Sequence, residues 1–189
     1  NENSQIRISV DCVDVIVEKN VDLVCCGYWI WSSELIKRPG FQPTNSLTEE
    51  NLFLSTPLIG GSSIIIRKDV FTKLGGFDEK CFTTEDKEFF LRLMNGKYGF
   101  YAFQSRLVNV DRTTTESLCT APSRDRVMSQ KYFYERYALE MSPEIRRRYL
   151  AKIEFGEAAS NGSLRGLIKP FFLYPALQHD IRRLLKVKI

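Results

Sequence analysis

The chain has 189 residues, of which 43% are hydrophobic and 26% are charged, and its formal net charge at pH 7 is +4. This is the composition of a soluble globular protein, and the length allows one substantial core with a tail. A single histidine and five cysteines without a C-x-x-C spacing exclude a Cys/His zinc site. We identify neither a signal peptide nor a run of roughly 18 to 20 apolar residues, and therefore expect a cytoplasmic protein with reduced thiols.

The first two predicted elements are a helix and a buried strand. Residues 6–18 place apolar side chains at steps of four, three and four, which is typical of a helix with one buried stripe: Ile6, Val10, Val13 and Val17. Residues 21–31 form an apolar run that predicts a central strand covered on both faces. Cys25 and Cys26 lie in this run, and we interpret them as core residues. A helix followed by a buried strand indicates an α/β fold.

The next part of the chain alternates loops with short elements. Residues 32–56 are polar and interrupted by prolines, so we predict a loop with one helical turn over residues 49–54. A glycine pair then precedes a β-branched strand. Residues 68–74 are predicted to form a short helix that ends at Gly75-Gly76, because glycine is preferred just past a helix C-terminus.

A longer amphipathic helix is predicted after this turn. Thr83 or Thr84 is a suitable N-cap, and the first turn is acidic, which complements the helix dipole. Asn95-Gly96 ends the helix. The predicted buried face consists of Phe89, Phe90, Leu93 and Met94.

Two strands and two helices complete the predicted elements. The strands are expected over residues 98–103 and 108–110, and the pattern beyond Pro122 is helical. The helices are predicted over residues 127–139 and 145–155. Ser142-Pro143-Glu144 is a good start for the second one, and Asn161-Gly162-Ser163 is a hinge before the tail.

Residues 60–93 carry four linked elements in a fixed order. The first is a strand of small residues that ends in an arginine, Gly61–Arg67, and the second is the turn Gly-Gly-Phe-Asp-Glu, Gly75–Glu79. The third is the acidic pair Glu85-Asp86, which opens a helix, and the fourth is the sequence Leu-Arg-Leu, Leu91–Leu93. In these elements the chain resembles the family 2 glycosyltransferases, which are inverting enzymes with a GT-A fold. The resemblance implies an α/β fold with a partial GT-A-type mixed sheet and flanking helices, followed by a helical C-terminal region.

The resemblance covers the acceptor side of that family. The nucleotide-binding N-terminal half, with the Asp-x-Asp that holds Mg²⁺ or Mn²⁺ on the diphosphate, has no counterpart in the sequence. Asp11 and Asp14 are three residues apart on a predicted helix, and we interpret them as solvated surface residues. Many relatives carry a histidine where this chain has Asp111-Arg112-Thr113. We therefore predict no metal ligand here: the full enzyme is expected to use a divalent metal, and this chain alone is expected to bind none.

The resemblance assigns Asp86 as the catalytic base. Inverting transfer needs one carboxylate to remove the proton of the acceptor hydroxyl. Glu85 points about 100° away from Asp86 on a helix, so hydrogen bonding to sugar hydroxyls fits it better. The alternative for the pair is an acidic first turn without a catalytic role, which is common in helices.

Four small residues are predicted to bind substrate: Gly60, Gly61, Ser62 and Ser63. Their size lets the backbone approach a sugar closely, and the hydroxyls can donate hydrogen bonds. A β-bulge or a tight packing site is the alternative. Gly76 and Asp78 are expected to shape the turn before the acidic pair, and Arg67 and Arg92 to be surface or ion-pair residues.

The excess positive charge lies in the tail. Residues 151–189 hold seven of the 27 basic residues and three of the 23 acidic ones, which leaves 20 of each in the rest of the chain. Mixed with Leu, Ile, Phe and Tyr, these charges are typical of a segment that lies on anionic lipid; helix packing or a subunit contact is the alternative. No nucleic-acid-binding module accompanies the charge, so we expect no nucleic-acid partner.

The sequence predicts three regions and leaves two functions open. The regions are an acceptor-side domain over residues 1–120, a helical extension over 121–160 and a basic amphipathic tail over 161–189, of which residues 162–189 would contact the membrane. The first function is transfer of a sugar from a nucleotide-diphospho-sugar to a glycan or lipid-linked acceptor in polysaccharide or surface-glycan synthesis, with this chain inactive alone. The second is a non-catalytic carbohydrate- or partner-binding remnant. A peripheral position on the inner face of the membrane and a homo-oligomer, formed through exposed strand edges, are further expectations.

Overall fold

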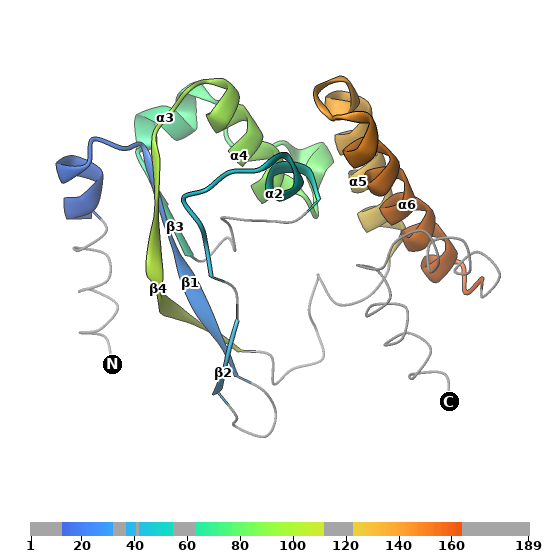
Figure 1. Ribbon diagram of the computed structural model, residues 1–189, viewed down its shortest axis with the longest axis horizontal. Coiled ribbons are helices and arrows are strands. Elements are labelled where there is room, and N and C mark those ends of the chain that lie inside the picture. The colour runs from blue at the N-terminus through green and yellow to red at the C-terminus, as the bar shows by residue number, and fades with distance from the viewer. Residues whose placement is uncertain (1–12, 32–36, 41, 55–62, 112–122, 164–189) are drawn as a thin grey trace. The chain divides into compact units, whose positions relative to one another are not determined.

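The computed structural model describes the chain in five stretches, residues 13–31, 37–40, 42–54, 63–111 and 123–163. The chain divides into two compact units. The first comprises Asn1–Asp78 and Asp86–Ser117, and the second comprises Glu79–Glu85 and Leu118–Ile189. Figure 1 labels the strands β1 to β4 and the helices α2 to α6.

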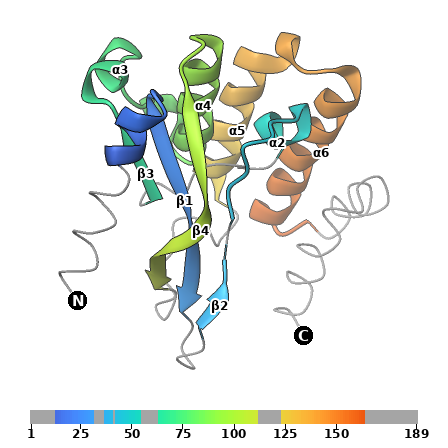
Figure 2. The ribbon, with the colours of Figure 1, turned by 60° about the vertical axis from the view of Figure 1, so that its left-hand side comes forward.

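The first unit is built around β1 (Leu23–Trp31), which pairs with three other strands. β2 (Lys37–Pro39) and β3 (Ile64–Ile66) run antiparallel to opposite ends of β1. β4 (Phe100–Asp111) runs parallel to it from end to end. Figure 2 shows the resulting four-stranded mixed sheet. The predicted central strand is confirmed, as is the predicted mixed sheet with flanking helices followed by a helical region.

β2 is a strand that the sequence does not predict. The pattern indicates a loop there, but Lys37–Pro39 pair with the last three residues of β1. A proline is tolerated in β2 because this strand lies at the edge of the described sheet. The backbone N–H of Gly40 then donates to the carbonyl oxygen of Tyr28 over 3.0 Å. A Cβ atom at Gly40 would lie 2.5 Å from the Tyr28 ring, so the chain needs glycine at this close approach.

β4 is one long strand where the sequence predicts two. Cys25 of β1 lies opposite Ala102 and Gly27 lies opposite Arg106, so β4 advances by four residues where β1 advances by two. An irregularity of this kind is a β-bulge, which interrupts the alternation of side chains along a strand. The interruption explains why the pattern alone indicates two separate strands.

Three helices of the first unit belong to the same face of the sheet. They are α2 (Glu49–Phe53), α3 (Lys68–Lys73) and α4 (Glu85–Asn95). Gly75 and Gly76 have φ angles of 80° and 70°, in the left-handed region that glycine adopts without strain. The predicted end of the helix over residues 68–74 is therefore confirmed.

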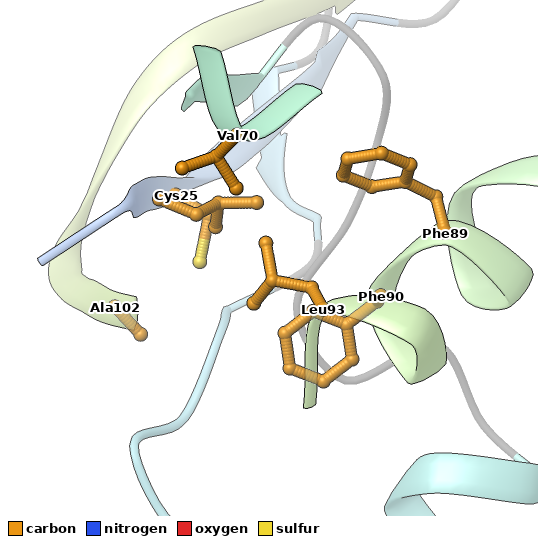
Figure 3. Packing of buried hydrophobic residues seen from close by; sticks show 7 residues of the cluster. Cys25, Val70, Phe89, Phe90, Leu93 and Ala102 are labelled. Atoms are coloured by element: carbon orange, nitrogen blue, oxygen red, sulfur yellow. The ribbon is translucent and has the colours of Figure 1, made fainter. Parts of the chain in front are cut away.

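The main core lies between this face of the sheet and α3 and α4 (Figure 3). Its buried members come from β1, β4, α3 and α4, and they are Leu23, Cys25, Val70, Phe89, Phe90, Leu93 and Ala102. The predicted buried face of α4 is confirmed, with Met94 partly buried at its end. Each large apolar side chain buried in this way contributes about 1.5–3 kcal/mol. The cluster therefore fixes α4 on the sheet.

A helical turn over residues 13–18 packs on the opposite face of the sheet. It contacts the sheet through Ile16, which is buried beside Val24 of β1. The predicted buried stripe is wrong at Val13 and Val17, which are exposed, because the turn presents its Val15–Ile16 side to the sheet. The other two residues of that predicted stripe lie outside the described residues.

The described cysteines are free thiols that pack as core residues, as predicted for Cys25 and Cys26. Cys81 in the second unit is also free and buried. Burial raises the pKa of the Cys26 thiol, and a hydrogen bond with the backbone of Leu107 opposes the shift only in part. A neutral thiol in such surroundings behaves as a small hydrophobe.

The described part of the second unit is helical. It consists of η2 (Glu79–Cys81), α5 (Arg124–Tyr137), η3 (Ala138–Glu140) and α6 (Pro143–Ser160). The Ser142 side chain accepts the backbone N–H of Ile145, as expected for an N-cap followed by proline. The predicted helical region after Pro122 is confirmed, and α6 begins two residues earlier and ends five residues later than the sequence indicates.

Aromatic residues join α5 to α6. The rings of Phe133 and Tyr149 are stacked with their centroids 5.4 Å apart, and both side chains are fully buried. Burial raises the pKa of the Tyr149 hydroxyl far above its usual range. None of the described helices has the length and apolarity that crossing a bilayer requires.

Candidate functional site

Asp86 is the second residue of α4 and is partly exposed. Helical geometry places it one turn before Phe89 and Phe90, and two turns before Leu93. These three side chains form the stripe of α4 that packs against the sheet. The Asp86 carboxylate therefore continues this stripe at the point where the apolar core ends, on the side of the helix that faces the sheet.

Glu85 precedes it and lies on a different side of the helix. It is one turn before Glu88 and two turns before Arg92, so it shares their side of α4. One carboxylate oxygen of Glu85 is buried. The two acidic residues thus differ in direction, as the sequence predicts from their spacing.

Arg92 joins α4 to the turn that follows α3. Its Nη2 donates to Glu88 Oε2 over 2.6 Å, and its Nε donates to Glu88 Oε1 over 2.8 Å. The guanidinium also donates to two backbone carbonyl oxygens, that of Leu74 and, over 2.7 Å, that of Gly76. The side chain of Glu88 is 0% exposed and that of Arg92 is 18% exposed, so this is a buried, multiply hydrogen-bonded ion pair.

Three phenylalanine rings reinforce the same junction. Phe71 of α3, Phe77 of the turn and Phe89 of α4 form a triangle in which each pair of ring centroids is 5.3 Å apart. The guanidinium of Arg92 lies 5.3 Å from the Phe89 ring centroid, within range of a cation–π interaction. The glycine turn and α4 are therefore held together by both polar and apolar contacts.

Lys87 holds the other side of α4. Its side chain is buried, and its Nζ donates over 2.9 Å to the carbonyl oxygen of Phe53, the last residue of α2. A cation at a helix C-terminus is favoured by the helix dipole. Asp86 thus lies on a helix that is anchored on three sides, by the core, by the Glu88–Arg92 pair and by Lys87.

Lys87 and Glu88 are residues that the sequence analysis does not single out. The spacing of Glu88 and Arg92 by four positions on a helix does indicate an ion pair, in agreement with the prediction that Arg92 is a surface or ion-pair residue. What the spacing does not reveal is the burial of the pair or its carbonyl acceptors. Arg67 is also paired: it lies 3.9 Å from Asp22 and donates to the carbonyl oxygen of Val21 over 3.1 Å.

The small residues expected to bind substrate are only partly described. Gly60, Gly61 and Ser62 lie outside the described residues. Ser63 is buried directly before β3, whose first residue pairs with Cys25 of β1. Its burial is equally suited to packing and to a directed hydrogen bond.

The described carboxylates do not fit the divalent ion that the resemblance implies for the full enzyme. No three His, Cys, Asp or Glu side chains of the described stretches gather as metal ligands would. Asp14 is exposed on its helical turn, and Asp11 lies outside the described residues. The basic tail proposed to contact the membrane also lies outside them from residue 164 onward.

The arrangement provides one carboxylate that is suited to accept a proton. Asp86 stands at the start of an anchored helix, so the position of its backbone is fixed by the packing of α4. Preorganisation of this kind is what general-base catalysis requires of a protein. The helix dipole favours the charged form of a carboxylate at this end.

Comparisons with known proteins give one match. A family model described as "Glycosyltransferase like family 2" matches residues 1–118. This range contains Asp86, the turn at Gly75-Gly76 and all four strands of the sheet. No curated protein and no solved structure matches the chain.

Proposed function

Because the chain belongs to glycosyltransferase-like family 2 and holds a partial domain of that family, we propose that it forms the acceptor side of an inverting glycosyltransferase. The reaction moves a sugar from a nucleotide-diphospho-sugar to an acceptor hydroxyl. The observation that carries the proposal is the position of Asp86 in the first turn of α4, a helix that is anchored through Arg92. Synthesis of a polysaccharide or surface glycan is the setting that fits this reaction.

In the proposed mechanism Asp86 is the general base. Its carboxylate accepts the proton of the acceptor hydroxyl while the hydroxyl oxygen attacks the anomeric carbon of the donor sugar. The new glycosidic bond forms as the bond to the diphosphate oxygen breaks on the opposite face, and the diphosphate leaves with the bonding electron pair. Attack opposite the leaving group inverts the configuration of the anomeric carbon.

The other acidic and small residues have supporting roles in this proposal. Glu85 and the segment Gly60–Ser63 hydrogen-bond sugar hydroxyls. Arg92 acts through Glu88 and the glycine turn and touches no substrate. The 189 residues contain no Asp-x-Asp pair, so we assign the donor diphosphate and its divalent ion to residues other than these.

The assignment of the donor diphosphate to other residues predicts how this chain binds nucleotides. Titration of the isolated chain with nucleoside diphosphates in a calorimeter should show weak binding that is the same with Mg²⁺, with Mn²⁺ and with EDTA. The reason is that phosphate affinity in these enzymes depends on a metal that the described carboxylates do not fit. Tight binding that EDTA removes would contradict the assignment of the donor site.

A transfer assay tests the function itself. The complete protein that carries these residues is mixed with α-linked nucleotide-sugar donors and candidate acceptors, and the anomeric proton is followed by NMR. The expected product is a β-linked glycoside. If no donor is consumed while carbohydrates still bind, the result favours the alternative function, a non-catalytic carbohydrate- or partner-binding remnant.

A further inference from the structure

Trp29 and Arg106 form a cation–aromatic pair away from the residues discussed so far. The guanidinium carbon of Arg106 lies 5.4 Å from the centroid of the Trp29 ring. The pair joins neighbouring parallel strands, since Trp29 belongs to β1 and Arg106 to β4. A guanidinium that lies over an aromatic ring keeps its N–H groups available as hydrogen-bond donors.

The hydrogen bonding of Arg106 is incomplete in the described part of the chain. Its Nε is buried and has no hydrogen-bond partner there. No described carboxylate forms an ion pair with it, in contrast to Arg67 and Arg92, which do have acidic partners. A buried donor without an acceptor is unfavourable by itself. The charge of Arg106 is therefore not neutralised by a described carboxylate, and an anionic ligand would supply that partner through the other N–H groups of the guanidinium.

The pair lies toward the carboxyl ends of two parallel strands, β1 and β4. Trp29 is the seventh residue of β1, whereas the residues of β1 in the core under α4 are its first and third, Leu23 and Cys25. The bulge in β4 sets Arg106 opposite Gly27, in the half of the strand nearer its carboxyl end. In Figures 1 and 2 this half of the sheet extends beyond α3 and α4. Ligands of α/β proteins bind at the carboxyl ends of parallel strands.

We propose that Trp29 and Arg106 form an acceptor subsite for a sugar that carries a carboxylate or a phosphate. The Trp29 ring stacks on the apolar face of the sugar ring, and the Arg106 guanidinium donates paired hydrogen bonds to the anionic group. The inference rests on the proposed glycosyl transfer and adds the class of acceptor to it. It predicts that the acceptor is an acidic glycan.

Tryptophan fluorescence measures binding at this position directly. The chain has two tryptophans, so the Trp31→Phe variant leaves Trp29 as its only tryptophan reporter. Titration with a glucuronate-containing disaccharide, or with a sugar phosphate, should quench this reporter. The matching neutral disaccharide should bind about tenfold more weakly, because one charge-assisted contact is lost.

Variants of Arg106 test whether its guanidinium binds the anionic group of the sugar. Arg106→Gln should weaken binding of the acidic sugar by about tenfold or more and remove the preference over the neutral one. Arg106→Lys should retain part of the preference, because it keeps the charge but loses the planar fork. Lys19→Gln is the matched control, since Lys19 lies 4.7 Å from the ring centroid of Tyr101 in a second cation–aromatic pair of the same unit. It should leave binding unchanged.

Three results would overturn the subsite. They are equal binding of neutral and acidic sugars, unchanged binding in Arg106→Gln, and a response to uridine diphosphate alone, which would assign the anion to the donor. The measurement uses neither a donor nor turnover. Failure of the binding test with transfer intact rejects the subsite only, whereas failure of transfer with binding intact rejects the proposed reaction only.

Discussion

Replacing Arg92 by methionine is expected to destabilise the first unit by about 3–5 kcal/mol. The substitution leaves Glu88, whose side chain is 0% exposed, without its cation in the protein interior, and breaking a buried pair from one side costs about this much. The carbonyl oxygens of Leu74 and Gly76 lose their guanidinium donor at the same time. The free energy of unfolding can be measured in urea from the fluorescence of the β1 tryptophans.

A second ion pair provides a matched control for this experiment. Lys73 and Asp69 are also four residues apart on a helix, at 3.4 Å, but their side chains are 65% and 64% exposed. Lys73→Met should therefore change the free energy of unfolding by less than about 1 kcal/mol. The double variant Glu88→Gln with Arg92→Met should be less destabilised than the two single changes added together, because no charge is left buried. A loss of stability in Arg92→Met as small as that in Lys73→Met would contradict a stabilising role for the buried Glu88–Arg92 pair.

The sequence predicts well those helices and strands in which the buried positions determine the spacing of apolar residues. β1 is covered on both faces, so its first five residues are all buried and its sequence is continuously apolar. The end of α3 is equally clear, because two residues with positive φ need glycine. The sheet-facing stripe of α4 also follows directly from helical periodicity, and with it the direction of Asp86.

The elements that the sequence misses depend on contacts between distant residues. Lys37–Pro39 form a strand only because β1 offers an edge to pair with. The bulge in β4 is set by its register against β1, which no local pattern encodes. Lys87 is a charged residue in a helix, and its burial depends on a carbonyl acceptor 34 positions earlier in the chain.

In the candidate site, too, the sequence predicts the residues but not the long-range contacts between them. The acidic pair, the glycine turn and Arg92 are all recognisable as a motif, but the motif does not say how they are joined. The structure supplies that link in the hydrogen bonds from Arg92 to carbonyl oxygens 16 and 18 positions earlier in the chain. It also brings Trp29 and Arg106 together, although they are far apart in the sequence and neither belongs to the motif.

Asp86→Asn is expected to have the largest effect on activity. The amide has nearly the same shape as the carboxylate, so the contacts that anchor α4 through Lys87 and Arg92 are retained. It cannot accept the proton of the acceptor hydroxyl, and loss of a general base lowers kcat by about 10²–10⁴-fold. Asp69→Asn is the matched control, because Asp69 is also a first-turn aspartate but lies exposed on α3. It should leave kcat unchanged.

The most direct test of Asp86 as the catalytic base is to measure kcat and donor affinity together in the complete protein and in its Asp86→Asn variant. A base that acts only in the transition state lowers kcat without weakening ground-state binding. We therefore predict a fall in kcat of about 10²–10⁴-fold, with a dissociation constant for the nucleotide-sugar that stays within about twofold. Near-normal turnover in Asp86→Asn would contradict the assignment of Asp86 as the catalytic base.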